Sequence, residues 1–65
     1  MAFMDITKVR KNDIVKFKAY ALRVEAEPIV SKGSITLNGR ISIDGSPLVT
    51  KRFLGGRIVE VIRST

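Results

Sequence analysis

The side chains of this sequence that could do chemistry are mostly basic, and they recur in short clusters. Lys and Arg neutralise the phosphates of a nucleic acid and release the counterions that its backbone carries. Twelve Lys and Arg against six Asp and Glu give a formal net charge of +6. This surplus predicts a polyanion, with nucleic acid first, as the partner, although net charge also keeps a small domain dissolved. The clustered cations are Lys8, Arg10, Lys11, Lys16, Lys18, Lys51, Arg52 and Arg57.

Catalysis and metal binding have few candidate residues. The sequence contains no His and no Cys, so the usual structural zinc sites are excluded. The acids are better interpreted as solvated or salt-bridging residues, and the serines lack a candidate base. The glycines do not have the spacing of a phosphate-binding loop and are interpreted as turn and bulge residues. We therefore expect a non-enzymatic binding module without a metal, a cofactor or a small-molecule substrate.

The length of 65 residues limits the chain to one small domain. A domain of this size buries only about 60% of the surface that its unfolded chain exposes. The hydrophobic content of 45% is enough for a compact core, and self-association could add stability. No segment approaches the ~18 apolar residues that a membrane span requires, and the apolar stretch 1–4 is too short for a signal peptide. A cytoplasmic protein is the expectation.

Apolar and polar residues alternate along most of the chain, which is the period of half-buried β-strands. The pattern predicts five strands, at residues 14–17, 20–26, 34–43, from Pro47 onward, and 57–63. Turns are expected at residues 18–19, 44–46 and 55–56, and a loop at 29–33. Residues 1–12 are interpreted as a basic leader in which 5–11 form a short strand or an extended arm. The prediction is an all-β chain with a small five-stranded barrel over residues 13–65.

The predicted faces of these strands follow from the alternation. Val15 and Phe17 share one face of the first strand. In the second strand Leu22, Val24 and Ala26 point inward, and in the fourth the inward residues are Val49 and Phe53, opposite to Leu48, Thr50 and Arg52.

The Asn38-Gly39 pair allows two interpretations. Asn-Gly is a strong signal for a two-residue hairpin turn, but a turn there would leave very short flanking strands. We favour a continuous strand in which Gly39 marks a bulge or a sharp bend that curls the sheet.

Three segments carry a family resemblance. They are Leu22-Arg23-Val24 with the following alternating acids, Lys32-Gly33, and the ending Phe53-Leu54-Gly55-Gly56-Arg57-Ile58-Val59-Glu60-Val61. Together with the spacing between them, they resemble the N-terminal domain of bacterial translation elongation factor P, a KOW-like, SH3-type β-barrel. The resemblance covers about two thirds to three quarters of the chain, which would be a stand-alone version of this module.

The resemblance implies a role in contact with RNA or the ribosome. In the family, the lysine at the position of Lys32 lies at a loop tip, can be modified and reaches into the ribosome's catalytic centre. Here the loop before Lys32 is about two residues shorter than in the family. On the stand-alone interpretation, we expect the oligonucleotide-binding-like domains that follow in the family to be missing.

Two functions from different classes therefore remain open. In a barrel whose first, fourth and fifth strands adjoin, the clustered cations would merge into one stripe that follows RNA phosphates, and Tyr20 would offer a stacking face for an unpaired base. The alternative is a protein-binding or homo-oligomeric module. In that case residues 1–4 would add a strand to another subunit, or Ile29 and Val30 would form an exposed apolar patch.

Overall fold

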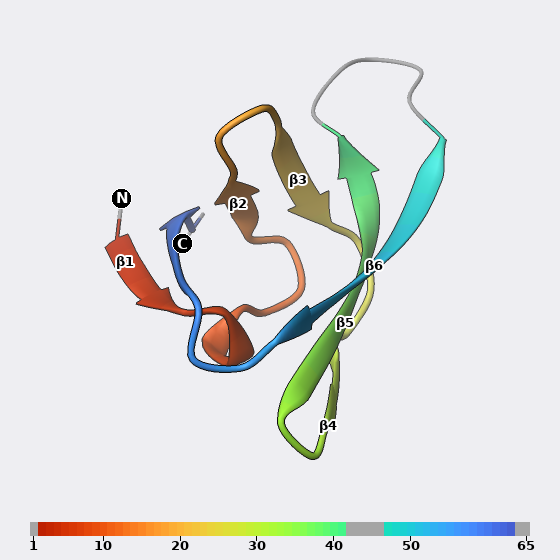
Figure 1. Ribbon diagram of the computed structural model, residues 1–65. Helices are drawn as coiled ribbons and strands as arrows, with labels where there is room; N and C mark the ends of the chain where they lie inside the picture. The colour runs from red at the N-terminus through yellow and green to blue at the C-terminus, as the bar shows by residue number, and fades with distance from the viewer. Residues whose placement is uncertain (1, 42–46, 64–65) are drawn as a thin grey trace.

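The chain is described by a computed structural model covering residues 2–41 and 47–63. It forms a single antiparallel sheet with one short 3₁₀ helix (Figure 1). The all-β prediction is confirmed, but the described residues form seven strands rather than five, because the segments 2–5 and 29–31 are strands as well. The elements are β1 (Ala2–Asp5), η1 (Ile6–Lys8), β2 (Ile14–Lys16), β3 (Ala21–Val24), β4 (Ile29–Ser31), β5 (Ser34–Ile41), β6 (Leu48–Leu54) and β7 (Ile58–Ile62).

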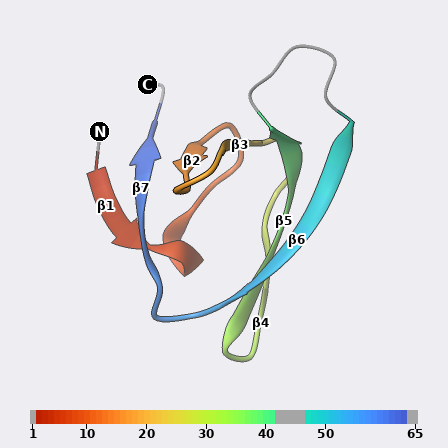
Figure 2. The ribbon, with the colours of Figure 1, turned by 45° about the horizontal axis from the view of Figure 1, so that its top comes forward.

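The sheet is curled into a half-barrel. Its strand order is β1-β7-β2-β3-β5-β4, and β6 pairs with the other edge of β5. β3 and β4 share one edge of β5, since β4 pairs with residues 34–36 and β3 with residues 39–41. β6 and β7 separate from their common connection, so the sheet bends around an interior (Figure 2). Within the described residues no pairing joins β6 to β1 or β7, and the barrel is therefore closed only in part.

The core lies on the concave face of this curl. Val15, Leu22 and Val24 are buried as the alternation predicts, but Ala26 is exposed, because β3 ends at Val24. η1 and the segment after it add Ile6 and Val9. The complete buried apolar set is Ile6, Val9, Val15, Leu22, Val24, Ile35, Leu37, Val59 and Val61.

The N-terminal segment differs from the predicted strand at 5–11. β1 ends at Asp5, whose carboxylate accepts a hydrogen bond from the Thr7 N–H (2.9 Å) and caps η1. The hydrogen bonds from Thr7 hold the pKa of Asp5 below its usual value. β1 pairs with β7 along its whole length, so residues 2–5 belong to the same sheet as the rest of the strands.

β5 runs without interruption through Asn38-Gly39, which excludes a hairpin at this position. Its pairing with β6 is continuous from Ser34↔Leu54 to Arg40↔Leu48, so the register contains no bulge. Gly39 is buried, and a Cβ atom there would overlap the carbonyl oxygen of Arg23 in β3. The glycine therefore permits the close approach of two strands, in place of the predicted bulge.

The predicted loop at 29–33 is wrong, because these residues contribute a hairpin. β4 pairs with β5 through Ser31↔Ser34, which leaves Lys32 and Gly33 as a two-residue turn. Gly33 has a φ of 75°, a value that glycine adopts without steric cost. The predicted turns at 18–19 and 55–56 are confirmed. The expected hairpin turn at 44–46 and the last two residues of the predicted strand 34–43 lie outside the described residues.

An ion pair between the buried carboxylate of Asp13 and the more exposed Arg63 joins the segment before β2 to the end of β7. Asp13 is 2% exposed, and its carboxylate accepts hydrogen bonds from Arg63 Nε (2.9 Å) and Nη2 (2.8 Å). The Arg10 N–H donates a further bond to Asp13 Oδ2 (2.8 Å). The Arg63 hydrogen bond outweighs burial and holds the pKa of Asp13 below its usual value. Asp13 is thus a structural residue that fixes the C-terminal strand.

Candidate nucleic-acid interface

Three aromatic rings meet between β6 and the connection from β2 to β3. The Phe17 N–H donates to the Tyr20 carbonyl (2.7 Å), which closes the turn and brings both residues to the same side. Their ring centroids are 5.0 Å apart at an interplanar angle of 34°. From β6, Phe53 stacks on Phe17 with a centroid distance of 5.1 Å and an angle of 14°. All three rings are half-buried against the core.

Two cations lie over these rings. The Lys51 Nζ atom is 5.4 Å from the centroid of Tyr20. The Arg57 Cζ atom is 5.3 Å from Phe17 and 5.5 Å from Phe53, so one guanidinium covers both phenyl rings. We call these five residues, Phe17, Tyr20, Lys51, Phe53 and Arg57, the basic-aromatic cluster.

The strand register explains how β6 supplies one cation and one ring to the cluster. Phe53 pairs with Ile35 and Lys51 pairs with Leu37, and both partners are fully buried on the concave face. Directly opposed residues of an antiparallel pair project to the same side. Phe53 and Lys51 therefore face the interior of the half-barrel, and the period of two places Arg52 on the outer surface.

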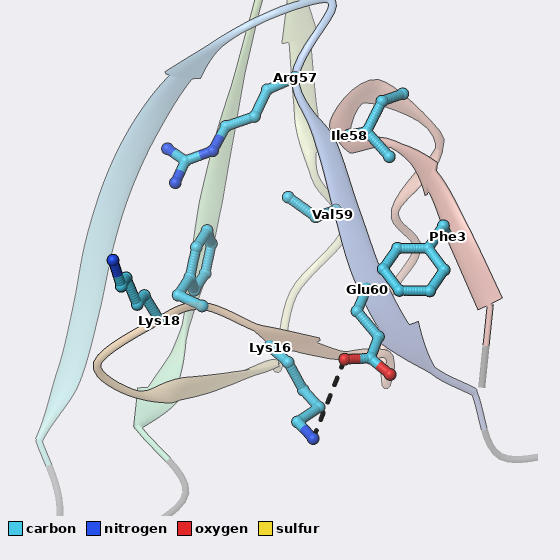
Figure 3. Close-up of a pocket in the computed structure, with 8 residues that line it drawn as sticks. Phe3, Lys16, Lys18, Arg57, Ile58, Val59 and Glu60 are labelled. Carbon is cyan, nitrogen blue, oxygen red and sulfur yellow. Dashed lines mark ion pairs between the residues drawn. The ribbon is translucent and has the colours of Figure 1, made fainter.

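A groove of about 380 Å³ adjoins the cluster (Figure 3). Arg57 and Lys18 reach toward one another at one side of it, while Phe3 and Ile58 lie on the other side of β7. Glu60 supplies an acid in the lining, and its Oε1 atom is 3.9 Å from Lys16 Nζ. The lining residues are Phe3, Lys16, Phe17, Lys18, Arg57, Ile58, Val59 and Glu60.

The placement of the carboxylates leaves this region positive. The ion pairs among the described residues are Asp13 with Arg63, Glu25 with Arg23 and Arg40, and Glu60 with Lys16. No described carboxylate lies within ion-pair distance of Lys18, Lys51 or Arg57. Uncompensated charges in a concave region add their fields and attract anions. Glu60 is neutralised locally by Lys16, so three cations dominate the groove and the cluster.

Of the ten residues predicted from the sequence to contact nucleic acid, five lie together in the groove and the basic-aromatic cluster. They are Lys16, Lys18, Tyr20, Lys51 and Arg57. The predicted adjacency of the first and last strands also holds, because β2 pairs with β7. β6, however, pairs with β5, and it meets the β2–β3 connection through the stacking of Phe53 on Phe17 and through Lys51 over Tyr20.

The other five predicted contact residues lie away from the groove and the cluster. Lys8 is in η1. Arg10 and Lys11 lie next to Asn12, whose N–H donates to the Val24 carbonyl. Val24 is at the end of β3, and Tyr20 precedes the start of that strand, so these cations are far from the cluster. Lys32 lies in the β4–β5 turn. Arg52 is on the outer face of β6, where its guanidinium donates to the hydroxyl of Ser34 (3.3 Å).

Phe17 and Phe53 are the two residues of the basic-aromatic cluster that were not predicted as site residues from the sequence. Their hydrophobicity favours a core interpretation, and they do pack against the core. One signal for their place beside a cation was present in the sequence. The alternation that places Phe53 inward also places Lys51 inward, so a lysine and a ring share one face of the strand.

The described part of the chain holds no group of three or more acids that could bind a metal ion. No helix within it is long and apolar enough to cross a membrane.

Comparison with known proteins gives no match to a protein family, to a curated protein or to a solved structure.

Proposed function

We propose that this chain is a non-enzymatic RNA-binding module whose contact surface is the basic-aromatic cluster, with Lys18 at its rim. The observation that supports the proposal is the combination of stacked rings with cations that have no described carboxylate partner. Cations supply contacts to phosphates, and aromatic rings supply faces on which bases stack.

The energetics favour this use of the cations. A cation over an aromatic ring at an exposed site contributes only about 0.5–1 kcal/mol. Arg57 is exposed and Lys51 is half-buried, so the rings hold both side chains weakly. Stacking of a base on an aromatic ring contributes about 1–3 kcal/mol. The bases of a nucleic acid can therefore displace the cations from the rings, and the displaced cations can then pair with its phosphates.

We further propose that the half-barrel is a variant of the SH3-type, KOW-like barrel that the resemblance to elongation factor P implies. The five predicted strands correspond to β2, β3, β5, β6 and β7, and β1 and β4 would be additions to that plan. A cytoplasmic role at the ribosome is the setting that the resemblance implies. On this basis Lys32, exposed in a two-residue turn, is a second place to test for contact.

The test is a titration of a fluorescent, mixed-sequence RNA at two salt concentrations. The site variant is Lys51→Gln with Arg57→Gln, and the matched control is Lys8→Gln with Lys11→Gln, which removes the same charge from exposed positions outside the cluster. Each lost phosphate contact lowers the salt slope by about 0.7 for single strands, so the site variant should lose about 1.4. Equal binding by the two double variants would refute the assignment of the cluster, and loss in the control alone would place the contact near η1 instead.

A second candidate function is protein binding or self-association, and the outer face of β1 and β7 favours it. Phe3 pairs with Glu60, which places Phe3 on the same face as Ile58 and Ile62. Phe3 is 74% and Ile58 63% exposed. Exposed apolar residues that adjoin one another mark interaction surfaces. Sedimentation at increasing protein concentration would detect self-association, and Ile62→Ser, at a position outside the groove lining, should weaken it without affecting RNA binding.

A further inference from the structure

We infer that the ligand of the basic-aromatic cluster is single-stranded RNA, and that one unpaired base replaces the Lys51 ammonium on the ring of Tyr20. This inference rests on the proposed function, and it adds the class of RNA and the position of one base. In the bound state Lys51 contacts the phosphate beside that base, and Arg57 and Lys18 contact the following phosphates.

The position of Lys51 makes this exchange possible without moving the sheet. Its backbone is fixed in β6 by pairing with Leu37 of β5. Its Nζ atom is 5.4 Å from the Tyr20 centroid, and no described carboxylate holds it there. A lysine side chain has four flexible methylene groups, so the ammonium can leave the ring while the strand stays in place.

Tyr20 is held so that a base can take over the vacated face. Phe17 contacts the ring at a centroid distance of 5.0 Å, and Phe17 is in turn stacked on Phe53. The ring is therefore supported by other side chains and does not need to reorient on binding. A base placed on Tyr20 would extend this row of rings, as bases do on the aromatic platforms of single-strand-binding proteins.

The position of the rings argues against a double helix. All three rings are half-buried on the concave side of the half-barrel. In a duplex the base faces are stacked on each other, and only base edges and the backbone are accessible. A base can reach Tyr20 only when it is turned out of a stack, which an unpaired strand allows at little cost. Lys18 and Arg57 line the adjoining groove at the place where the backbone would continue.

The chain provides its own reporter for this contact. Tyr20 is its single Tyr, and it contains no Trp. Intrinsic fluorescence therefore comes from the proposed stacking residue. We would titrate the full chain with a labelled oligouridine of about eight nucleotides, within the usual range of single-strand sites, and with a duplex RNA of the same length. The expected result is quenching of Tyr20 with the same midpoint as the anisotropy change for the single strand, and at least tenfold weaker binding of the duplex.

Two variants separate the base contact from the phosphate contact. Tyr20→Leu keeps an apolar side chain but removes the ring, so single-strand affinity should fall roughly tenfold, whereas Tyr20→Phe should bind like the unmodified chain by anisotropy. Lys51→Met keeps the apolar stem and loses the charge. It should lower the salt slope by about 0.7 while Tyr20 is still quenched. Circular dichroism of each variant confirms that the sheet is retained.

The possible failures are distinguishable. Salt-dependent binding without a change in Tyr20 emission, or equal affinity for single strand and duplex, would overturn this inference and leave the proposed function standing. Absence of binding to either RNA at low salt would overturn both. Loss of quenching in Lys51→Met would show that the ammonium is needed at the ring, contrary to the exchange.

Discussion

The replacement of Gly39 by alanine tests the contact on which the curl of the sheet depends. Gly39 pairs with Val24, and its neighbour Arg40 pairs with Arg23, so β3 is attached to the C-terminal half of β5 at this point (Figure 1). A Cβ atom on residue 39 would overlap the Arg23 carbonyl oxygen and approach Val24 Cα to 3.1 Å. These are backbone atoms, so the clash cannot be relieved by a change of rotamer. β3 and β5 must separate.

The size of the effect follows from this geometry. Overpacking of an interior costs typically about 1–3 kcal/mol, and we expect about 3 kcal/mol here because the backbone must yield. The better conformational entropy of alanine offsets only about 0.5–1 kcal/mol. A 65-residue chain has a free energy of unfolding of roughly 3–10 kcal/mol at ~0.05–0.15 kcal/mol per residue. A net loss of about 2 kcal/mol would thus lower Tm by about 8–16 °C in a domain of this size.

Gly55 provides a matched control within the same chain. A Cβ atom there would meet its closest neighbour, Thr7 Cγ2, at 3.5 Å, which is ordinary van der Waals contact. Gly55→Ala should therefore be neutral, or stabilise the fold by up to about 1 kcal/mol by restricting the unfolded chain. The assay is thermal and urea unfolding followed by circular dichroism. If Gly39→Ala melted within about 4 °C of Gly55→Ala, the close approach of β3 and β5 would be refuted.

Two further predictions concern Asp13 and Phe53. Because the Arg63 hydrogen bond holds the pKa of Asp13 below its usual value, the stabilisation from this pair is fully present above the unfolded-state pKa of about 3.9 and is lost as pH falls through the lower folded-state value. Arg63→Gln should remove this acid dependence, as urea unfolding at a series of pH values would show; an unchanged dependence would contradict the role of the pair. Phe53→Ala should cost about 2–3 kcal/mol, less than the 3–5 kcal/mol of a fully buried aromatic, since Phe53 is half-buried. A variant that unfolded like the unmodified chain would show that Phe53 does not contribute to the core.

The strands that were predicted from the sequence are those that bury one face against the core and leave the other face exposed. Along β2, β3, β5, β6 and β7, more buried and more exposed residues mostly alternate, and the inward residues Val15, Leu22 and Leu37 are fully buried. β1 and β4 could not be found in this way. Phe3, Ile29 and Val30 are apolar but exposed in the structure, because these edge strands contribute backbone pairing rather than an apolar face.

The candidate site could be predicted only in its composition. Lys51 and Arg52 were predicted to belong to one site, but they lie on opposite faces of β6. Neighbouring residues of a strand point to opposite sides, and this is the same period of two that predicted the strand. The grouping of Tyr20, Lys51 and Arg57 depends on how β6 crosses the connection between β2 and β3. That crossing is set by the long-range curl of the sheet, and the local signal at Gly39 does not show which distant residues the curl brings together.

The basic-aromatic cluster is located where the sheet leaves its interior uncovered, and this explains its mixed composition. A closed barrel would pair β6 with another strand and bury Phe17 and Phe53 completely. Here the rings cover the open side of a small core, and Arg57 lies over both of them. A chain of 65 residues without Cys cannot form disulfides, so its few aromatic residues are needed for the stability of the fold. The same rings therefore stabilise the half-barrel and form the platform of the proposed RNA site, so charge substitutions at Lys51 and Arg57 are better probes of function than removal of a ring.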